Sequence, residues 1–196
     1  MSEPETAVLR PPSISESEGS PYDLVSVIAP DPHLAAEGVV LRVPNDGDAP
    51  WIEEAWNDAD IAQFIVGTPP PRRWASSTGA EFVVTDAGHD EPLGFVSLRI
   101  AEGDPGLAAV GYWLRPEARG RGAATVAVRL IARWAFKELG VQRLELTTAP
   151  ENVASQHVAE RVGFIREGVL RGLTAATKNN ARRDAVIYSL LRADLG

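Results

Sequence analysis

The feature that most constrains this chain is a turn rich in glycine and arginine, placed between a predicted strand and a predicted helix. It reads Arg-Gly-Arg-Gly over residues 119–122. A helix N-terminus carries free N–H groups and a partial positive charge, which together bind phosphate. Gly120 and Gly122 let the backbone approach an anion closely, and the two arginines add positive charge. The turn therefore predicts a site for a compact, phosphate-bearing ligand.

Other phosphate-binding motifs, and a purely structural turn, compete with this interpretation. A Walker loop requires Lys followed by Ser or Thr after its last glycine, where this chain has Ala123 and Ala124. A dinucleotide-binding fingerprint requires glycine at the next position, which is Thr125 here. The alternative that remains is a turn that uses glycine only for its backbone shape.

Hydrophobic periodicity predicts regular structure from residue 38 onward. Strands are predicted at residues 38–43, 81–85, 92–100, 107–114, 143–148, 164–170 and 184–191. Helices are predicted from residue 46 or 48 to 64 (with a break near Asp58), within 72–79, and at 122–139 and 152–162. The apolar face of the helix at 122–139 consists of Val126, Leu130, Ile131, Trp134, Ala135 and Leu139. This order of elements predicts an α/β (α+β) fold with a mixed sheet covered by helices.

The front of the chain differs in composition from the remainder. Residues 1–37 are rich in proline and serine and cannot bury much apolar surface. They are therefore predicted to be a largely irregular N-terminal extension, with short strands at residues 8–9 and 24–28 packed on the domain edge. The domain itself is predicted to cover residues 38–196.

Several motifs, in a shared order and spacing, resemble those of the GNAT N-acetyltransferase superfamily. The turn matches its pyrophosphate-binding pattern as Arg119-x-x-Gly122-x-Ala124. Further matches resemble the branch that acetylates the N-terminal alanine or serine of ribosomal proteins, and they lie at residues 111–114, 144–146, 152–155, 160–164, 167–168 and 184–191. The resemblance covers about residues 38–194. It implies a mostly antiparallel central sheet with helices on both faces and one splayed pair of strands.

The resemblance implies acetyl-CoA as the acyl donor and no metal. Its pyrophosphate would lie on the turn, and its amide-like pantetheine arm would pair with exposed backbone as an added strand does. A backbone N–H near Trp113 and Leu114 would stabilise the oxyanion that forms when an amine attacks the thioester. The residues implied to bind acetyl-CoA are Trp113, Leu114, Arg119, Gly120, Arg121, Gly122, Ala123, Ala124, Asn152 and Ser155.

The candidate catalytic residues are Glu145 and Ser155. Glu145 would assist deprotonation of the amine through a water, and the alternative is a surface or paired strand carboxylate. Ser155 matches a family serine near the sulfur and would protonate the leaving thiolate, and the alternative is a serine that completes the helix cap made by Asn152. The tyrosine acid frequent in this family has no counterpart in residues 152–162, and residues 173–174 replace a carboxylate found in some relatives.

Composition limits the partners further. The chain contains no cysteine and has a net charge of −8, which excludes a thiolate nucleophile and argues against direct nucleic-acid binding. No apolar run is long enough to span a bilayer and no secretory signal is visible, so we expect no membrane partner and a cytoplasmic location. His33, His89 and His157 are isolated and lack the spacing of metal ligands.

Together these observations predict an acetyl-CoA-dependent N-acetyltransferase that acts on a primary amine by direct attack, without a covalent enzyme intermediate. The acceptor is either a protein N-terminus or a small-molecule amine, and the protein is expected to be a monomer or a homodimer. The alternative is a non-catalytic acyl-CoA sensor or interaction module on the same fold, an idea that the missing tyrosine supports.

Overall fold

The computed structural model describes residues 34–58, 61, 79–101, 103–174 and 182–195. The strands are β1 (Leu34–Ala36), β2 (Val39–Arg42), β3 (Gly79–Asp86), β4 (Pro92–Ala101), β5 (Asp104–Leu114), β6 (Arg143–Thr148), β7 (Ile165–Thr174) and β8 (Arg183–Leu191). The α-helices are α1 (Ala49–Asn57), α3 (Ala123–Glu138) and α4 (Val153–Val162). Short 3-10 helices occur at η1 (Asp46–Asp48), η2 (Pro116–Ala118) and η3 (Arg192–Leu195).

The strands of the described residues form one sheet in the order β1-β2-β3-β4-β5-β6-β8-β7. Neighbouring strands run antiparallel, except that β5 and β6 run parallel. A parallel pair needs a crossover, and α3 supplies it here. The predicted mixed, mostly antiparallel sheet is therefore confirmed.

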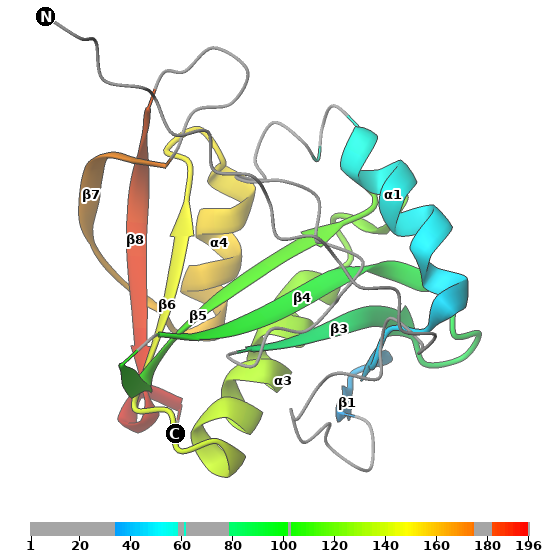
Figure 1. The fold of residues 1–196 in the computed structure, drawn as a ribbon, viewed down its shortest axis with the longest axis horizontal. Helices are drawn as coiled ribbons and strands as arrows, with labels where there is room; N and C mark the ends of the chain where they lie inside the picture. Colours follow the sequence, from blue (N-terminus) through cyan, green and yellow to red (C-terminus); the bar gives the residue numbers. More distant parts are fainter. Residues whose placement is uncertain (1–33, 59–60, 62–78, 102, 175–181, 196) are drawn as a thin grey trace, which may run out of the picture.

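Helices cover both faces of this sheet (Figure 1). On one face α3 packs against β1, β2, β4 and β5, and α4 packs against α3, β6 and β7. On the other face Ile52 of α1 is buried together with Val83 and Phe95. Because successive strand residues point to opposite faces, β3 contributes Phe82 and Val84 to the α3 side and Val83 to the α1 side.

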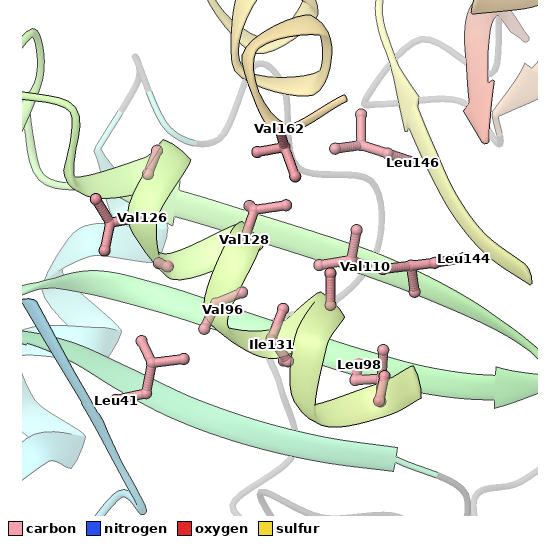
Figure 2. Packing of buried hydrophobic residues seen from close by; sticks show 14 of the residues in the cluster. Leu41, Val96, Leu98, Val110, Val126, Val128, Ile131, Leu144, Leu146 and Val162 are labelled. Atoms are coloured by element: carbon pink, nitrogen blue, oxygen red, sulfur yellow. The ribbon is translucent and has the colours of Figure 1, made fainter. Parts of the chain in front are cut away.

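The main core lies between α3 and the sheet. Ile131 of α3 is fully buried, and Trp134 meets Phe82 of β3 edge to face with ring centroids 5.5 Å apart. Burying a large apolar side chain contributes about 1.5–3 kcal/mol, so this face of α3 fixes the helix on the sheet. Most of the apolar face predicted for α3 is buried, and the other members are partly buried. Figure 2 shows this packing for Leu41, Val96, Leu98, Val110, Val126, Val128, Ile131, Leu144, Leu146 and Val162.

The first helix breaks at the position where the sequence predicts a break. It stops at Asn57 because Asp58 has extended backbone angles of φ −67° and ψ 127°, and the Asp58 carboxylate accepts a hydrogen bond from the N–H of Ile61 instead. The break expected near Asp58 is thus confirmed. Beyond the break, Ile61 is helical and buried. The other residues of that predicted helix after Asp58, most of the helix predicted within residues 72–79, and the short strands predicted at residues 8–9 and 24–28 lie outside the described residues.

The sheet starts before the expected domain boundary at residue 38. β1 pairs with β2 through three residue pairs, and a strand this short has too few residues to show a periodicity. The boundary itself stays a prediction.

In the part of the chain that the structure describes, no helix combines the length and hydropathy needed to cross a membrane.

Candidate active site

The two parallel strands are paired only at their starts. Residues 107–109 of β5 pair with residues 143–145 of β6. Beyond this point β5 continues to Leu114 and β6 to Thr148 without pairing to each other, and Figure 1 shows the two strands diverging. This confirms the splayed strand pair. The edge of β5 after Ala109 is therefore available to pair with an extended, amide-bearing ligand.

The helix that follows β5 begins without a side-chain cap. Gly122 is its N-cap, has a φ of 84°, and makes no side-chain hydrogen bond to the helix. Gly120 also has a positive φ of 78°, and a Cβ added at either glycine would have no atom within 4 Å. The first N–H groups of α3 thus stand beside an open side of the turn, which is the arrangement that receives phosphate.

The turn places positive charge at the same point. Arg119 is tied to the end of β5, since its Nε donates to the carbonyl oxygen of Leu114 at 3.2 Å. Arg121 is exposed, whereas Ala123 and Ala124 are buried. The two alanines therefore offer backbone groups rather than side chains to a ligand, and the arginines offer charge.

The side chains at the end of β5 are already engaged. The ring of Trp113 stacks on Phe95 with centroids 6.1 Å apart and an interplanar angle of 15°, and it meets Trp51 edge-on at 5.7 Å. Leu114 is buried in the main core. Their backbone on the open edge of β5 is not involved in these contacts, and the expected pairing of Trp113 and Leu114 with a ligand through the backbone stays a prediction.

α4 begins opposite the unpaired part of β5. Asn152 caps this helix, and its Oδ1 accepts a hydrogen bond from the N–H of Ser155 at 3.0 Å. The side chain of Ser155 makes a separate hydrogen bond, in which its hydroxyl oxygen accepts from the hydroxyl of Tyr112 on β5 at 3.0 Å. Burial raises the pKa of Tyr112 to about 12, although the bond to Ser155 opposes this, so the phenol stays protonated and acts as the donor.

The contact between Tyr112 and Ser155 joins β5 to α4 across the divergence of β5 and β6. Sequence reasoning searched for a tyrosine within α4 and missed this one, which comes from the strand. The two residues are 43 positions apart, so no local pattern reveals the pairing. The capping role expected for Asn152 is confirmed.

The second candidate catalytic residue lies where the strands begin to diverge. Glu145 is the Cα partner of Ala109, in the last residue pair between β5 and β6. Its Oε1 accepts from Arg143 Nε at 2.9 Å, and Arg143 also makes a two-pronged contact with Glu167. The bond from Arg143, together with one from Ser189, lowers the pKa of Glu167 to about 2. The structure thus realises the paired-carboxylate alternative for Glu145, and a catalytic role for it stays a prediction.

Comparison with known proteins gives this geometry a context. The sequence model of the acetyltransferase (GNAT) domain matches residues 35–165. The chain belongs to the GNAT acetyltransferase family. The acetyltransferase is 37% identical over 165 residues to a Bacillus subtilis (strain 168) protein named ribosomal N-acetyltransferase YdaF. The aligned region covers 84% of this chain and 87% of the relative.

Solved structures agree with this assignment. Mycobacterium smegmatis RimJ in complex with CoA-disulfide has a TM-score of 0.68 and 25% identity, covering 80% of this chain and 83% of that one. The spermidine N-acetyltransferase from Vibrio cholerae in complex with CoA and spermine has a TM-score of 0.70 and 23% identity, covering 81% of this chain and 98% of that one. The latter shows a likeness of fold.

The acetyltransferase transfers the acetyl group of acetyl-CoA to a primary amine, and a non-catalytic sensor is not supported. Its own residues fit this donor, because an uncapped helix N-terminus, two arginines and an unpaired strand edge follow one another along the chain. In the described residues no cluster of His, Asp or Glu has the arrangement of a metal site.

Proposed function

We propose that this acetyltransferase modifies the α-amino group at the N-terminus of a protein. The observation that supports this acceptor is the similarity to the ribosomal N-acetyltransferase YdaF, which extends over most of both chains. The cytoplasmic location and the monomer or homodimer expected from the sequence belong to the same proposal.

Acetyl-CoA is held, in this proposal, along the path from β5 to α3 and α4. Arg119, Arg121 and the backbone of residues 120–124 bind the pyrophosphate at the helix N-terminus. The free edge of β5 at Trp113 and Leu114 pairs with the pantetheine arm, and Asn152 touches the same arm from α4. A backbone N–H at the end of β5 stabilises negative charge on the acetyl oxygen as the amine adds.

The leaving thiolate requires a proton, and the proposal assigns its delivery to Ser155. Because the Tyr112 hydroxyl donates to the Ser155 oxygen, the serine proton is free to point elsewhere, toward the sulfur. Tyr112 thereby orients Ser155 and can replace the proton that it gives away. Glu145 stays the proposed assistant for deprotonation through a water, although its carboxylate is bound by Arg143.

The acceptor class is tested by thiol release from acetyl-CoA with a panel of amines. Peptides with a free N-terminal alanine or serine are expected to be acetylated, because an α-amino group has a pKa near ~8 and is partly neutral at physiological pH. The same peptides with a blocked N-terminus and an internal lysine serve as the control and are expected to give no turnover. Faster release with spermidine than with any peptide would contradict the protein acceptor.

Substitution of Tyr112 tests the proton donor. Tyr112→Phe and Ser155→Ala are each expected to lower kcat by about tenfold or more while leaving the affinity for acetyl-CoA unchanged. Because the two hydroxyls act in series, the double variant is expected to lose little more than either single one. Tyr188→Phe is the matched control, since Tyr188 also bonds to α4 but through Gln156 and Glu160. Additive losses, or an equal loss in the control, would contradict the assignment.

A further inference from the structure

A buried carboxylate on the sheet is not used by the site described so far. Glu81 lies on β3, and its side chain is only 10% exposed. Its Oε1 accepts from Arg99 Nη2 of β4 at 3.2 Å. Its Oε2 is buried without a hydrogen-bond partner in the described part of the chain. A buried charged oxygen without a donor is costly and points to a missing partner.

The strand register places Glu81 in one row with the unpaired part of β5. Glu81 is the Cα partner of Ser97 on β4, and Ser97 is the partner of Gly111 on β5. Gly111 lies beyond the last residue of β5 that pairs with β6. The three residues form one row across the sheet, so they point to the same face. Two strand spacings separate Glu81 from Gly111, which is roughly 10 Å between Cα atoms.

The row of Glu81, Ser97 and Gly111 carries no large side chain after Glu81. Ser97 has a small side chain, whose hydroxyl donates to the Gly111 carbonyl oxygen at 3.4 Å, and Gly111 has none and is exposed. No bulky side chain of the row therefore stands between the Glu81 carboxylate and the free end of β5. This is the face opposite α3, so a donor bound along β5 could be approached from here.

We propose that Glu81 binds the amine of the acceptor through Oε2 and removes its proton. The inference rests on the proposed function, since it concerns the acceptor in the same reaction. A proton passes from the ammonium nitrogen to Oε2, which leaves the nitrogen lone pair free. That pair forms the carbon–nitrogen bond, the carbon–sulfur bond breaks, and the sulfur takes a proton from Ser155. A second amine proton returns to Ser155 through solvent, and Glu81 releases its own proton to solvent. Both side chains are thereby regenerated, and one proton is set free in each turnover.

Charge around Glu81 supports the assignment. Burial raises the pKa of Glu81 to about 7, although the nearby Arg99 opposes this, and a base is most effective when its pKa lies near the working pH. The side chain of Arg99 is 61% exposed and contacts Glu81 only through Oε1, so Oε2 is left for the amine. Arg42 of β2 lies on the same face of the sheet as Glu81, and its guanidinium is bound by the carboxylate of Asp48. Glu145 is also bound by an arginine, Arg143, but neither of its carboxylate oxygens is buried without a partner.

The proposal is tested with Glu81→Gln, which keeps the size of the side chain and removes the base. Its kcat/KM with a free N-terminal peptide is expected to fall by roughly 100-fold at neutral pH, with unchanged affinity for acetyl-CoA by calorimetry. Glu138→Gln at the exposed end of α3 is the control and is expected to match the wild type. Full activity of Glu81→Gln would overturn the proposal.

Glu81→Gln is expected to fold. The pKa of Glu81 is raised from 4.5 to about 7, so its ionisation increasingly opposes folding as the pH rises between these two values, and glutamine removes that cost. A second test leaves Glu81 in place. Because Arg99 lowers the pKa of Glu81, Arg99→Met is expected to move the acid limb of the kcat/KM profile to higher pH. The α-amino group of the peptide titrates identically in both enzymes, so an unmoved limb would exclude Glu81 as the base.

These outcomes separate this inference from the proposed function. If the wild type acetylates another amine and no peptide, the proposed acceptor is wrong, and Glu81→Gln is then measured with that amine. If the wild type acetylates peptides and both Glu81→Gln and Arg99→Met leave the profile unchanged, the acceptor class stands and the role of Glu81 is wrong.

Discussion

Replacing Gly122 by glutamate is expected to abolish detectable binding of acetyl-CoA while leaving the fold intact. The new carboxylate would stand at the uncapped N-terminus of α3, where it would compete with the pyrophosphate for the same N–H groups and repel it. We expect a loss of at least ~100-fold in affinity, which corresponds to about 2.8 kcal/mol. Isothermal calorimetry with acetyl-CoA measures this directly.

The control for this substitution must carry the same backbone strain and the same charge. Gly140 fulfils both conditions, because its φ is 73° and an added Cβ would likewise meet no atom within 4 Å. A side chain at a positive φ costs about 1–2 kcal/mol, so both variants are expected to lose stability on thermal unfolding, and Gly140→Glu loses somewhat more because its carboxylate follows the negative C-terminal end of α3. Only the first should lose acetyl-CoA binding. Wild-type affinity in Gly122→Glu would refute the placement of the pyrophosphate.

Asp48→Ala is expected to lower the free energy of unfolding by about 3 kcal/mol, because removing one partner of a buried ion pair leaves the other uncompensated. Asp48 is 2% exposed. Its two oxygens accept from Arg42 at 2.7 and 2.8 Å, from the Asn45 N–H at 2.7 Å and from Trp51 Nε1 at 3.0 Å. Chemical denaturation measures the loss, and the exposed Asp46 of the same turn gives the control, with less than about 0.5 kcal/mol expected for Asp46→Ala.

The contribution of Asp48 is expected to depend on pH. Burial alone would raise its pKa, but the hydrogen bonds from Arg42, Asn45 and Trp51 outweigh burial and hold the pKa below its ordinary value of 3.8. A lowered pKa stabilises the fold above the ordinary value, and this stabilisation is lost as the pH falls through the folded-state pKa. The stability difference between wild type and Asp48→Ala should therefore narrow below a pH of 3.8. A difference that stays constant on acidification would contradict this role.

Asp48 also connects stability to the site. It holds the indole of Trp51, and Trp51 contacts the ring of Trp113 at the end of β5. Trp113 in turn stacks on Phe95. Loss of Asp48 is therefore expected to loosen the side-chain packing beneath the strand edge that is proposed to bind acetyl-CoA.

The sequence by itself determined the features that depend on neighbouring residues. Apolar spacing located α3 and its buried face, because a helix places residues three and four apart on one side. The glycines and arginines of residues 119–122 predicted the open helix N-terminus, since positive φ angles and uncapped N–H groups are local properties. Asn152 was predicted as a cap for the same reason.

Only the tertiary structure decided which distant groups meet. Strand register sets the row from Glu81 to Gly111, and the early end of pairing between β5 and β6 opens the edge of β5. The approach of α4 to β5 brings the Tyr112 hydroxyl to Ser155. A shift of one residue in register would turn Glu81 to the opposite face. Such contacts arise from the packing of whole strands and helices, and no short stretch of sequence encodes them.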